Sequence, residues 1–390
     1  MATPLYFLGT YVAIWILISV GWWAFKAERF GITGLPFYII YRTTRLNKWI
    51  GKVAVLSRTA WRTIWNLGIV TGIGLMIYIF YQLGKNLLNL FVRSEQAVSI
   101  QPIVPLPGLF VSFETFPYLV LALSVVVVTH ELSHGIASLA DRIPLKTTGA
   151  FFAHVLMGGF VEPDEEKLTK ARNITKLRVF AAGSYTNAVL GVLFVFLLFS
   201  FPATIAPFYN VVQTGVTIGS IPDNLPAHLS GLNAGDVVSS INGTKISGIV
   251  ALRAYMNKVR PGELVVVGTE RGEFPVRTSE DPSNSTHSVI GISGLTDNTV
   301  YRPKYPFLPG GLPTILIHAE FWLSIVLVSV ALINMLPIYP FDGDKFLETA
   351  LNMAGLRRTK EIRTAANVAA YSLLLLNIGL SLVRFGFVRF

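Results

Sequence analysis

The stretch Thr129-His130-Glu131-Leu132-Ser133-His134-Gly135 carries an H-E-x-x-H pattern inside an almost unbroken apolar run, Phe116 to Ala140. Residues four apart share one face of a helix, so His130 and His134 can bind one metal ion while Glu131 lies beside it. The pattern is short and also arises by chance. In hydrocarbon, however, two imidazoles and a carboxylate are costly unless they serve a function. This setting favours a zinc hydrolase site within a membrane over a buried polar contact between two helices.

The whole chain has the composition of an α-helical, polytopic membrane protein. Apolar residues make up 52% of the sequence and charged residues only 14%, and apolar stretches recur at bilayer-spanning length. Six spans are predicted: Pro4 to Phe25, Ile64 to Phe91, Phe116 to Ala140, Val179 to Phe201, Ile315 to Leu336 and Ala365 to Val383. The first lacks a basic n-region and a small-residue cleavage site, which favours a membrane helix over a signal peptide. Because the chain has no cysteine, any metal ligands must be His, Asp or Glu.

Basic loops predict the orientation of these spans. The segment between the first two spans carries many Lys and Arg residues against one acid, Glu28, which places this segment in the cytoplasm. Its Phe37 to Tyr41 stretch and Trp49 are expected on the membrane surface. Both termini and the segment 207–300 are then extracytoplasmic in a multi-pass protein of the cell membrane. The net charge of +10 needs no nucleic-acid partner to explain it.

The segment 207–300 differs in composition from the rest of the chain. Strands are predicted at Val212 to Ile221, Val237 to Ile241, Leu264 to Gly268 and Phe274 to Arg277, and a helix at Ile249 to Val259. We therefore expect an inserted α+β domain at 207–300, between membrane-domain parts at 1–206 and 301–390.

Most of this insertion resembles the bacterial-type PDZ domain. The resemblance rests on Ala227 to Leu232, on the turn Asn233-Ala234-Gly235-Asp236 and on Ile241-Asn242-Gly243. PDZ domains bind extended peptide ends by adding a strand to a sheet. The resemblance implies a peptide ligand, and a β-rich lid that only restricts access is the alternative.

Two short strands are predicted beside the third span, at Gly149 to His154 and Met157 to Val161. Irregular backbone is tolerated at membrane depth only where protein buries it or where it lines a cavity. A hairpin here would offer a sheet edge to a substrate strand. A simple interfacial loop is the alternative.

The two histidines need a third ligand, because a catalytic zinc commonly has three protein ligands and a water. His130 lies fourteen residues into its helix, about 21 Å from the outer end, and therefore in the cytoplasmic third of the span. Glu320 lies near the outer end of the fifth span, whereas Asp342 follows its inner end, where two prolines break the helix. Asp342 is therefore the predicted ligand, and an ordinary helix cap is the alternative.

Together these motifs resemble the site-2 protease family of intramembrane zinc metalloproteases. In that family H-E-x-x-H and a later N-P-P-(L)DG element supply the metal site. Here the second element is Asn334 to Gly343, with Phe341 where Leu is usual and Asp344 where a second Gly often follows. The stretch Gly183 to Asn187 resembles the family's G-x-x-x-N element, with Ser184 in place of the usual Pro.

The predicted chemistry is peptide-bond hydrolysis. Zinc held by His130, His134 and Asp342 would activate a water molecule and polarise the scissile carbonyl. Glu131 would take the proton of that water and deliver it to the leaving amine.

The resemblance also implies roles for two amides and a class of substrate. Asn187 and Asn334 would orient the substrate backbone or steady the metal site, and interhelical hydrogen bonding is the alternative. The expected partners are the lipid bilayer and transmembrane protein substrates cleaved within or near the membrane, in regulated intramembrane proteolysis. Two rival functions stay open: a catalytically silent scaffold that binds partner peptides, and a proton- or ion-coupled transporter.

Overall fold

The computed structural model describes residues 4–35, 37–108, 110–153, 156–223, 225–281 and 284–388. The chain forms two compact units, Met1–Phe199 with Ile317–Phe390, and Ser200–Leu316. The predicted domain 207–300 lies inside the second unit, and its boundaries stay a prediction. His154, at the tip of the predicted hairpin, lies outside the described residues.

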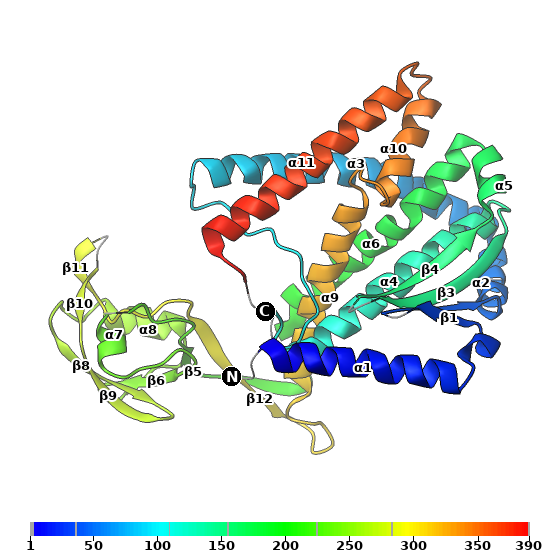
Figure 1. Cartoon of the computed structure of the whole chain (residues 1–390). Helices are drawn as coiled ribbons and strands as arrows, with labels where there is room; N and C mark the ends of the chain where they lie inside the picture. The colour runs from blue at the N-terminus through cyan, green and yellow to red at the C-terminus, as the bar shows by residue number, and fades with distance from the viewer. Residues whose placement is uncertain are drawn as a thin grey trace. The chain divides into compact units, whose positions relative to one another are not determined.

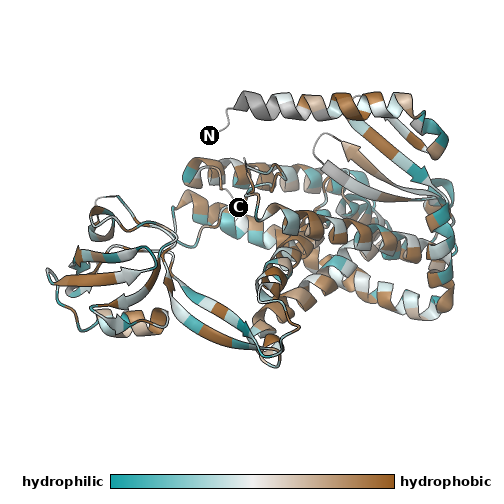
Figure 2. Cartoon of the chain, turned by 90° about the horizontal axis from the view of Figure 1, so that it is seen from below, coloured by the Kyte–Doolittle hydropathy of each residue, from teal (hydrophilic) through white to brown (hydrophobic). Residues whose placement is uncertain are grey.

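The first unit is built mainly of long apolar helices (Figure 1). Within the described ranges, five helices are long and apolar enough to cross a bilayer: α3 (Arg58–Phe91), α4 (Phe116–Ala140), α6 (Asn173–Ile205), α9 (Leu312–Asn334) and α11 (Thr359–Phe385). Hydrophobic residues recur along them (Figure 2). Because several helices have this length and composition, the chain is an integral membrane protein. A further helix, α1 (Pro4–Ala24), occupies the first predicted span, but only its Trp15–Ala24 part appears among the apolar helices, as a shorter one. A sixth span therefore stays a prediction.

Four short helices connect these elements: η1 (Ala27–Phe30), α2 (Arg45–Leu56), α5 (Glu165–Lys170) and α10 (Asp342–Met353). Local sequence explains the ends of α4. Pro117 occupies its first turn, where a missing N–H costs nothing, and the helix ends before Arg142, whose φ of 66° turns the chain away. The metal-binding motif therefore lies in the second half of α4.

A four-stranded antiparallel sheet lies against α4 in the order β1-β2-β3-β4. The predicted hairpin is confirmed as β3 (Leu145–Ala153) and β4 (Leu156–Pro163). The sequence did not predict β1 (Ile32–Leu35) and β2 (Tyr38–Thr43), which extend the hairpin into a sheet. Gly149 permits this pairing, since a Cβ there would lie 2.1 Å from the Tyr41 carbonyl oxygen. β4 is left as an edge strand beside α4.

Hydrogen bonds between polar side chains link the helices of this unit. The Arg62 and Arg178 side chains, from α3 and α6, both donate hydrogen bonds to Asp141 at the end of α4. Farther along α3, Asn86 donates to the Asn377 side-chain oxygen of α11 at 2.9 Å. Such bonds matter in lipid, where helices gain little from hydrophobic association. They fix α3, α4, α6 and α11 against one another.

The second unit is a small α+β fold. Its main sheet is antiparallel and runs β12-β5-β6-β8-β9, with β7 paired to β6. The strands are β5 (Tyr209–Thr217), β6 (Val237–Ile241), β7 (Thr244–Lys245), β8 (Leu264–Thr269), β9 (Gly272–Arg277) and β12 (Thr296–Pro303). A separate pair, β10 (Ser279–Asp281) and β11 (Asn284–Val289), and two helices, α7 (Pro226–Leu229) and α8 (Ile249–Met256), complete it.

The sequence predicted four strands and one helix of this unit, but not β7, β10, β11, β12 or α7. The four predicted strands correspond to β5, β6, β8 and β9, and the predicted helix to α8. The Asn242-Gly243 turn has φ values of 48° and 73°, as expected for a tight hairpin turn. β12 was missed because its sequence is polar and its pairing partner, β5, lies more than seventy residues earlier in the chain.

Candidate metal centre

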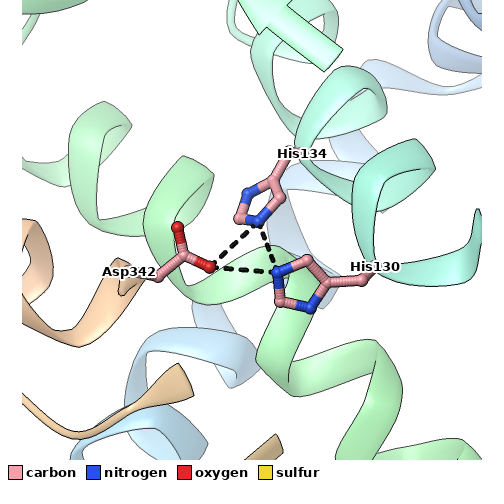
Figure 3. Close-up of side chains that lie close together, drawn as sticks. All are labelled: His130, His134 and Asp342. Carbon is pink, nitrogen blue, oxygen red and sulfur yellow. Dashed lines mark hydrogen bonds and ion pairs between the residues drawn. The ribbon is translucent and has the colours of Figure 1, made fainter. Parts of the chain in front are cut away.

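Three predicted ligands converge at one point of the first unit. His130 and His134 project from adjacent turns of α4, and Asp342 is the first residue of α10 (Figure 3). The two Nε2 atoms lie 3.1 Å apart, and each lies 3.1 Å from Asp342 Oδ2. Both histidines are buried. The three atoms form a compact triangle that one cation could occupy.

The hydrogen bonding of His134 is compatible with a metal ligand. Its Nδ1 lies 2.7 Å from the Val179 carbonyl oxygen, which can only accept, so Nδ1 carries a proton. In the neutral imidazole, Nε2 then directs a lone pair at the carboxylate of Asp342. Two imidazole nitrogens and a carboxylate oxygen are also the ligand types that zinc binds, with a fourth position left for water. The residues therefore fit a zinc ion.

His130 is held by an amide from α6. Its Nδ1 lies 3.2 Å from Asn187 Nδ2, and Thr129 Oγ1 lies 3.2 Å from Asn187 Oδ1. A His130 that binds metal through Nε2 carries its proton on Nδ1, so it requires the Asn187 oxygen to face it, with the amide turned by 180°. Thr129 Oγ1 donates to the Val125 carbonyl at 2.8 Å and can then accept from the amide nitrogen. Asn187 thus contacts His130 and does not line the cavity over the metal-ligand group.

Two glycines let the backbone approach the ligands closely. A Cβ on Gly183 would lie within 2.6 Å of three atoms of the His130 ring. A Cβ on Gly343 would lie 2.4 Å from the Leu336 carbonyl oxygen, so α10 can begin where it does only with glycine after Asp342. Both glycines belong to motifs visible in the sequence, but those motifs do not predict this packing role.

Glu131 lies beside the ligands without joining them. Its Oε2 accepts a hydrogen bond of 2.9 Å from the backbone N–H of Val161 in β4. The carboxylate therefore connects the metal-binding helix to the edge strand. This bond fixes one oxygen of the group expected to move a proton.

A cavity of about 550 Å³ opens over this group. Its wall includes the three ligands, Glu131, Asn334 at the end of α9, and Gly158, Gly159 and Val161 of β4. The structure therefore separates the two predicted amides. Asn334 lines the cavity, whereas Asn187 is fully buried behind His130. Glu320, the rejected ligand, is not brought into the group; its Oε2 is buried in α9 without a hydrogen-bond partner among the described residues.

One of the residues that depart from the family pattern, Asp344, has a partner that the sequence did not reveal. Asp344 is buried and accepts a forked pair of hydrogen bonds from the Arg363 guanidinium of α11. Asn367 Nδ2 adds a third bond at 2.9 Å. The first turn of α10, which begins with Asp342, is therefore tied to α11.

The chain is similar in sequence to known proteins. The family model described as peptidase family M50 matches residues 118–378. The membrane-bound transcription factor site-2 protease homolog of Arabidopsis thaliana is 31% identical over 172 residues, which cover 42% of this chain and 33% of that protein. An uncharacterized protein of Methanocaldococcus jannaschii is 22% identical over 240 residues, 61% of this chain and 58% of its own. The chain thus spans between a third and three fifths of the length of these two relatives.

Other similarities are shorter. The periplasmic serine endoprotease DegP of Escherichia coli is 29% identical over 83 residues, 21% of this chain and 18% of DegP. Among solved structures, the PDZ domain of the SdrC-like protein from Listeria monocytogenes is 24% identical. That match covers 22% of this chain and 90% of the domain, with a TM-score of 0.20.

Proposed function

Because the chain belongs to peptidase family M50, a family of membrane metallopeptidases, we propose that it is an intramembrane zinc metalloprotease of the site-2 type. The observation that carries this proposal is the triangle of His130 Nε2, His134 Nε2 and Asp342 Oδ2 on the wall of a cavity among apolar helices. The reaction is hydrolysis of a peptide bond within or near a transmembrane segment of another membrane protein.

The roles of the residues follow from their positions. When bound, zinc would lower the pKa of a coordinated water and polarise the scissile carbonyl. His130, His134 and Asp342 hold the ion, with Val179 and Asn187 fixing the imidazole orientations. The Glu131 carboxylate, held through Oε2, takes the proton from the water and delivers it to the leaving amine. Asn334, on the cavity wall, donates its amide N–H to the substrate backbone.

The edge of β4 offers a way to present the scissile bond. One side of β4 pairs with β3, while Gly158, Gly159 and Val161 line the cavity. A peptide bond in a helix is shielded by its own hydrogen bonds, so the substrate must unwind before attack. An extended substrate segment that adds to β4 would regain the lost backbone hydrogen bonds in a water-poor setting. The proposed reaction would serve regulated intramembrane proteolysis, as the resemblance to the site-2 proteases implies.

We assign the remaining features on the same basis. The metal centre faces the cytoplasmic side, and both termini and the segment 207–300 are extracytoplasmic, as the basic loops predict. The segment 207–300 acts as a PDZ-like domain, and the peptide end of a substrate or partner is its ligand.

One experiment tests the proposal. The purified full-length protein is incubated in detergent with a transmembrane test substrate, with and without a zinc chelator, alongside Glu131→Gln. A matched control is Glu320→Gln, which removes another carboxylate from an apolar helix that is not part of the metal group. Cleavage should require zinc and Glu131 but not Glu320. Cleavage by Glu131→Gln at the wild-type rate would contradict the protease function, and a zinc-loaded wild type that binds but never cleaves substrates would favour the scaffold.

A further inference from the structure

A second hollow in the first unit has a different chemistry from the metal centre. Its volume is about 550 Å³, and its lining shares no residue with the cavity over the metal site. Three arginines from three elements line it: Arg29 of η1, Arg42 of β2 and Arg45 at the start of α2. Three threonines also line it: Thr43, Thr44 and Thr147.

The positive charge of this hollow is not neutralised from within the described part of the chain. No carboxylate lines it, and none of its three arginines is ion-paired with an acid in the ranges that the structure describes. Among the described residues, the Arg42 side chain donates a hydrogen bond to Thr33 Oγ1 at 3.3 Å and lies over the Phe160 ring. Glu28 lines a neighbouring hollow with Arg29, but not this one. Three guanidinium groups around one space repel one another unless an anion lies between them.

Backbone donors reinforce this preference for an anion. The hollow includes the first residue of α2, a helix of twelve residues, and its N-cap residue Thr44 makes no side-chain capping bond. Thr43 Oγ1 accepts from the Arg45 N–H, while the next N–H groups of the first turn have no partner within the helix. Such groups favour phosphate. Arginine, whose planar fork matches phosphate oxygens, is the residue type best suited to the rest of the wall.

The surroundings of the hollow match the headgroup level of a membrane. Large exposed aromatic side chains flank its elements: Trp23, Phe25, Phe30, Tyr41 and Trp49. Aromatic residues of this kind gather at membrane–water interfaces. α1 is apolar up to Ala24 and is followed at once by η1, so the basic hollow lies just beyond the end of a hydrophobic helix.

An apolar cleft on the same hairpin favours a lipid over a free anion as the ligand of the hollow. It has a volume of about 250 Å³ and is lined by α1 side chains, including Trp15 and Ile18, with Gly34 and Ile39 of the β1–β2 hairpin. Gly34 pairs with Ile39 only two positions from the pair of Ile32 with Tyr41, and Tyr41 lines the basic hollow. Two strand positions correspond to about 7 Å. A basic hollow and an apolar cleft at this spacing fit the two ends of one amphipathic molecule.

We propose that this hollow binds the phosphate group of an anionic phospholipid, with an acyl chain in the apolar cleft between α1 and the β1–β2 hairpin. The site is separate from catalysis. It would hold α1 and the β-sheet to the leaflet in which the basic loop lies.

The test compares two double variants of the full-length chain. Arg29→Gln/Arg45→Gln removes two charges from the hollow, and Arg357→Gln/Arg358→Gln removes two from the exposed linker before α11, on the same predicted side. Each protein is placed in nanodiscs of phosphatidylcholine with or without phosphatidylglycerol, and bound lipid is counted by native mass spectrometry. Thermal unfolding and zinc content establish that each variant is folded.

The hollow variant should retain phosphatidylglycerol about fivefold less for each arginine removed, while the linker variant retains it as wild type does. A second arm uses inorganic phosphate in place of the lipid. Equal retention by both variants would overturn the proposal. The proposal would also be overturned if inorganic phosphate bound in a way that depends on Arg29 and Arg45 while lipid binding did not depend on them. The site would then serve a free anion.

Discussion

Gly183 of α6 lies directly against the His130 ring: a Cβ on this glycine would lie 2.5 Å from Cε1 and 2.6 Å from both ring nitrogens. The imidazole can reach the metal position only because residue 183 has no side chain. We therefore expect Gly183→Ala to displace His130 and to weaken zinc binding at least tenfold, the effect typical of lost ligand support. Zinc content after dialysis against a graded chelator series measures this, together with substrate cleavage.

Gly74→Ala is the matched control for this change. Gly74 lies in α3, a helix of the same unit, and no atom lies within 4 Å of the Cβ that alanine would add. Alanine is also the better helix former. Zinc binding by Gly74→Ala should equal that of wild type, and an unchanged zinc affinity in Gly183→Ala would show that His130 does not depend on this close contact.

The sequence could predict which residues meet at the site but not what supports them. The spacing of His130 and His134 and the depth of Asp342 follow from helix geometry, and the structure brings these three together. The contact of Gly183 with His130 and the bond of Arg363 to Asp344 join residues that are far apart in the chain. Neither has a local pattern, because an absent side chain or a distant guanidinium leaves no periodicity to detect.

The two asparagines of the site should affect different properties, zinc affinity for Asn187 and substrate cleavage for Asn334. Asn187 is buried against His130 and Thr129, so Asn187→Ala should lower zinc affinity about 10- to 100-fold. Asn334 lines the cavity, so Asn334→Ala should keep its zinc and lose cleavage. Zinc titration and the separate values of kcat and KM distinguish the two. Equal zinc loss in both variants would contradict the separation that their positions imply.

The Arg363–Asp344 pair predicts how a single and a double substitution change the stability of the protein. Arg363→Met leaves the buried Asp344 carboxylate with Asn367 alone, and removing one partner of a buried pair costs about 3–5 kcal/mol. The lower end applies, since the arginine side chain is 31% exposed. The double variant Asp344→Asn/Arg363→Met should recover part of this loss, because no buried charge then remains. Thermal unfolding followed by tryptophan fluorescence measures both.

The control for this pair is Arg357→Met, which removes an exposed arginine just before α11. Its unfolding temperature should equal that of wild type. A double variant no more stable than Arg363→Met would show that the cost comes from lost packing rather than from an uncompensated charge.

The fold itself was predictable where one segment carries its own signal. Long apolar runs predict α3, α4, α6, α9 and α11, and alternating strands with Gly turns predict most of the second unit. β1 and β2 were missed because they are short, lie among basic residues and complete their pairing only with β3, more than a hundred residues later. Strands of this kind are stabilised by their partners and not by local pattern.

Asp236 and Arg271 form a forked ion pair that links the stability of the second unit to pH. Arg271 Nε and Nη2 each lie 2.6 Å from a carboxylate oxygen of the buried Asp236, and these bonds hold the pKa of Asp236 below its usual range. In the unfolded chain the pKa of this carboxyl is about 3.9. Since the folded-state pKa is the lower one, the pair contributes stability that is complete above the unfolded value and is lost as the pH falls through the folded value.

We therefore expect amide protection in β6 and β8, corrected for intrinsic exchange rates, to decline below about pH 4 in the wild-type protein. In Asp236→Asn, this amide protection should be lower at pH 7 than in the wild type. It should also decline less on acidification, because the variant has no carboxylate at this position to protonate. Glu270→Gln, which removes a nearby exposed carboxylate, should follow the wild-type curve. If the curves of protection against pH for Asp236→Asn and wild type run parallel, other groups cause the acid sensitivity. If the two curves converge at low pH, the Asp236–Arg271 pair causes it.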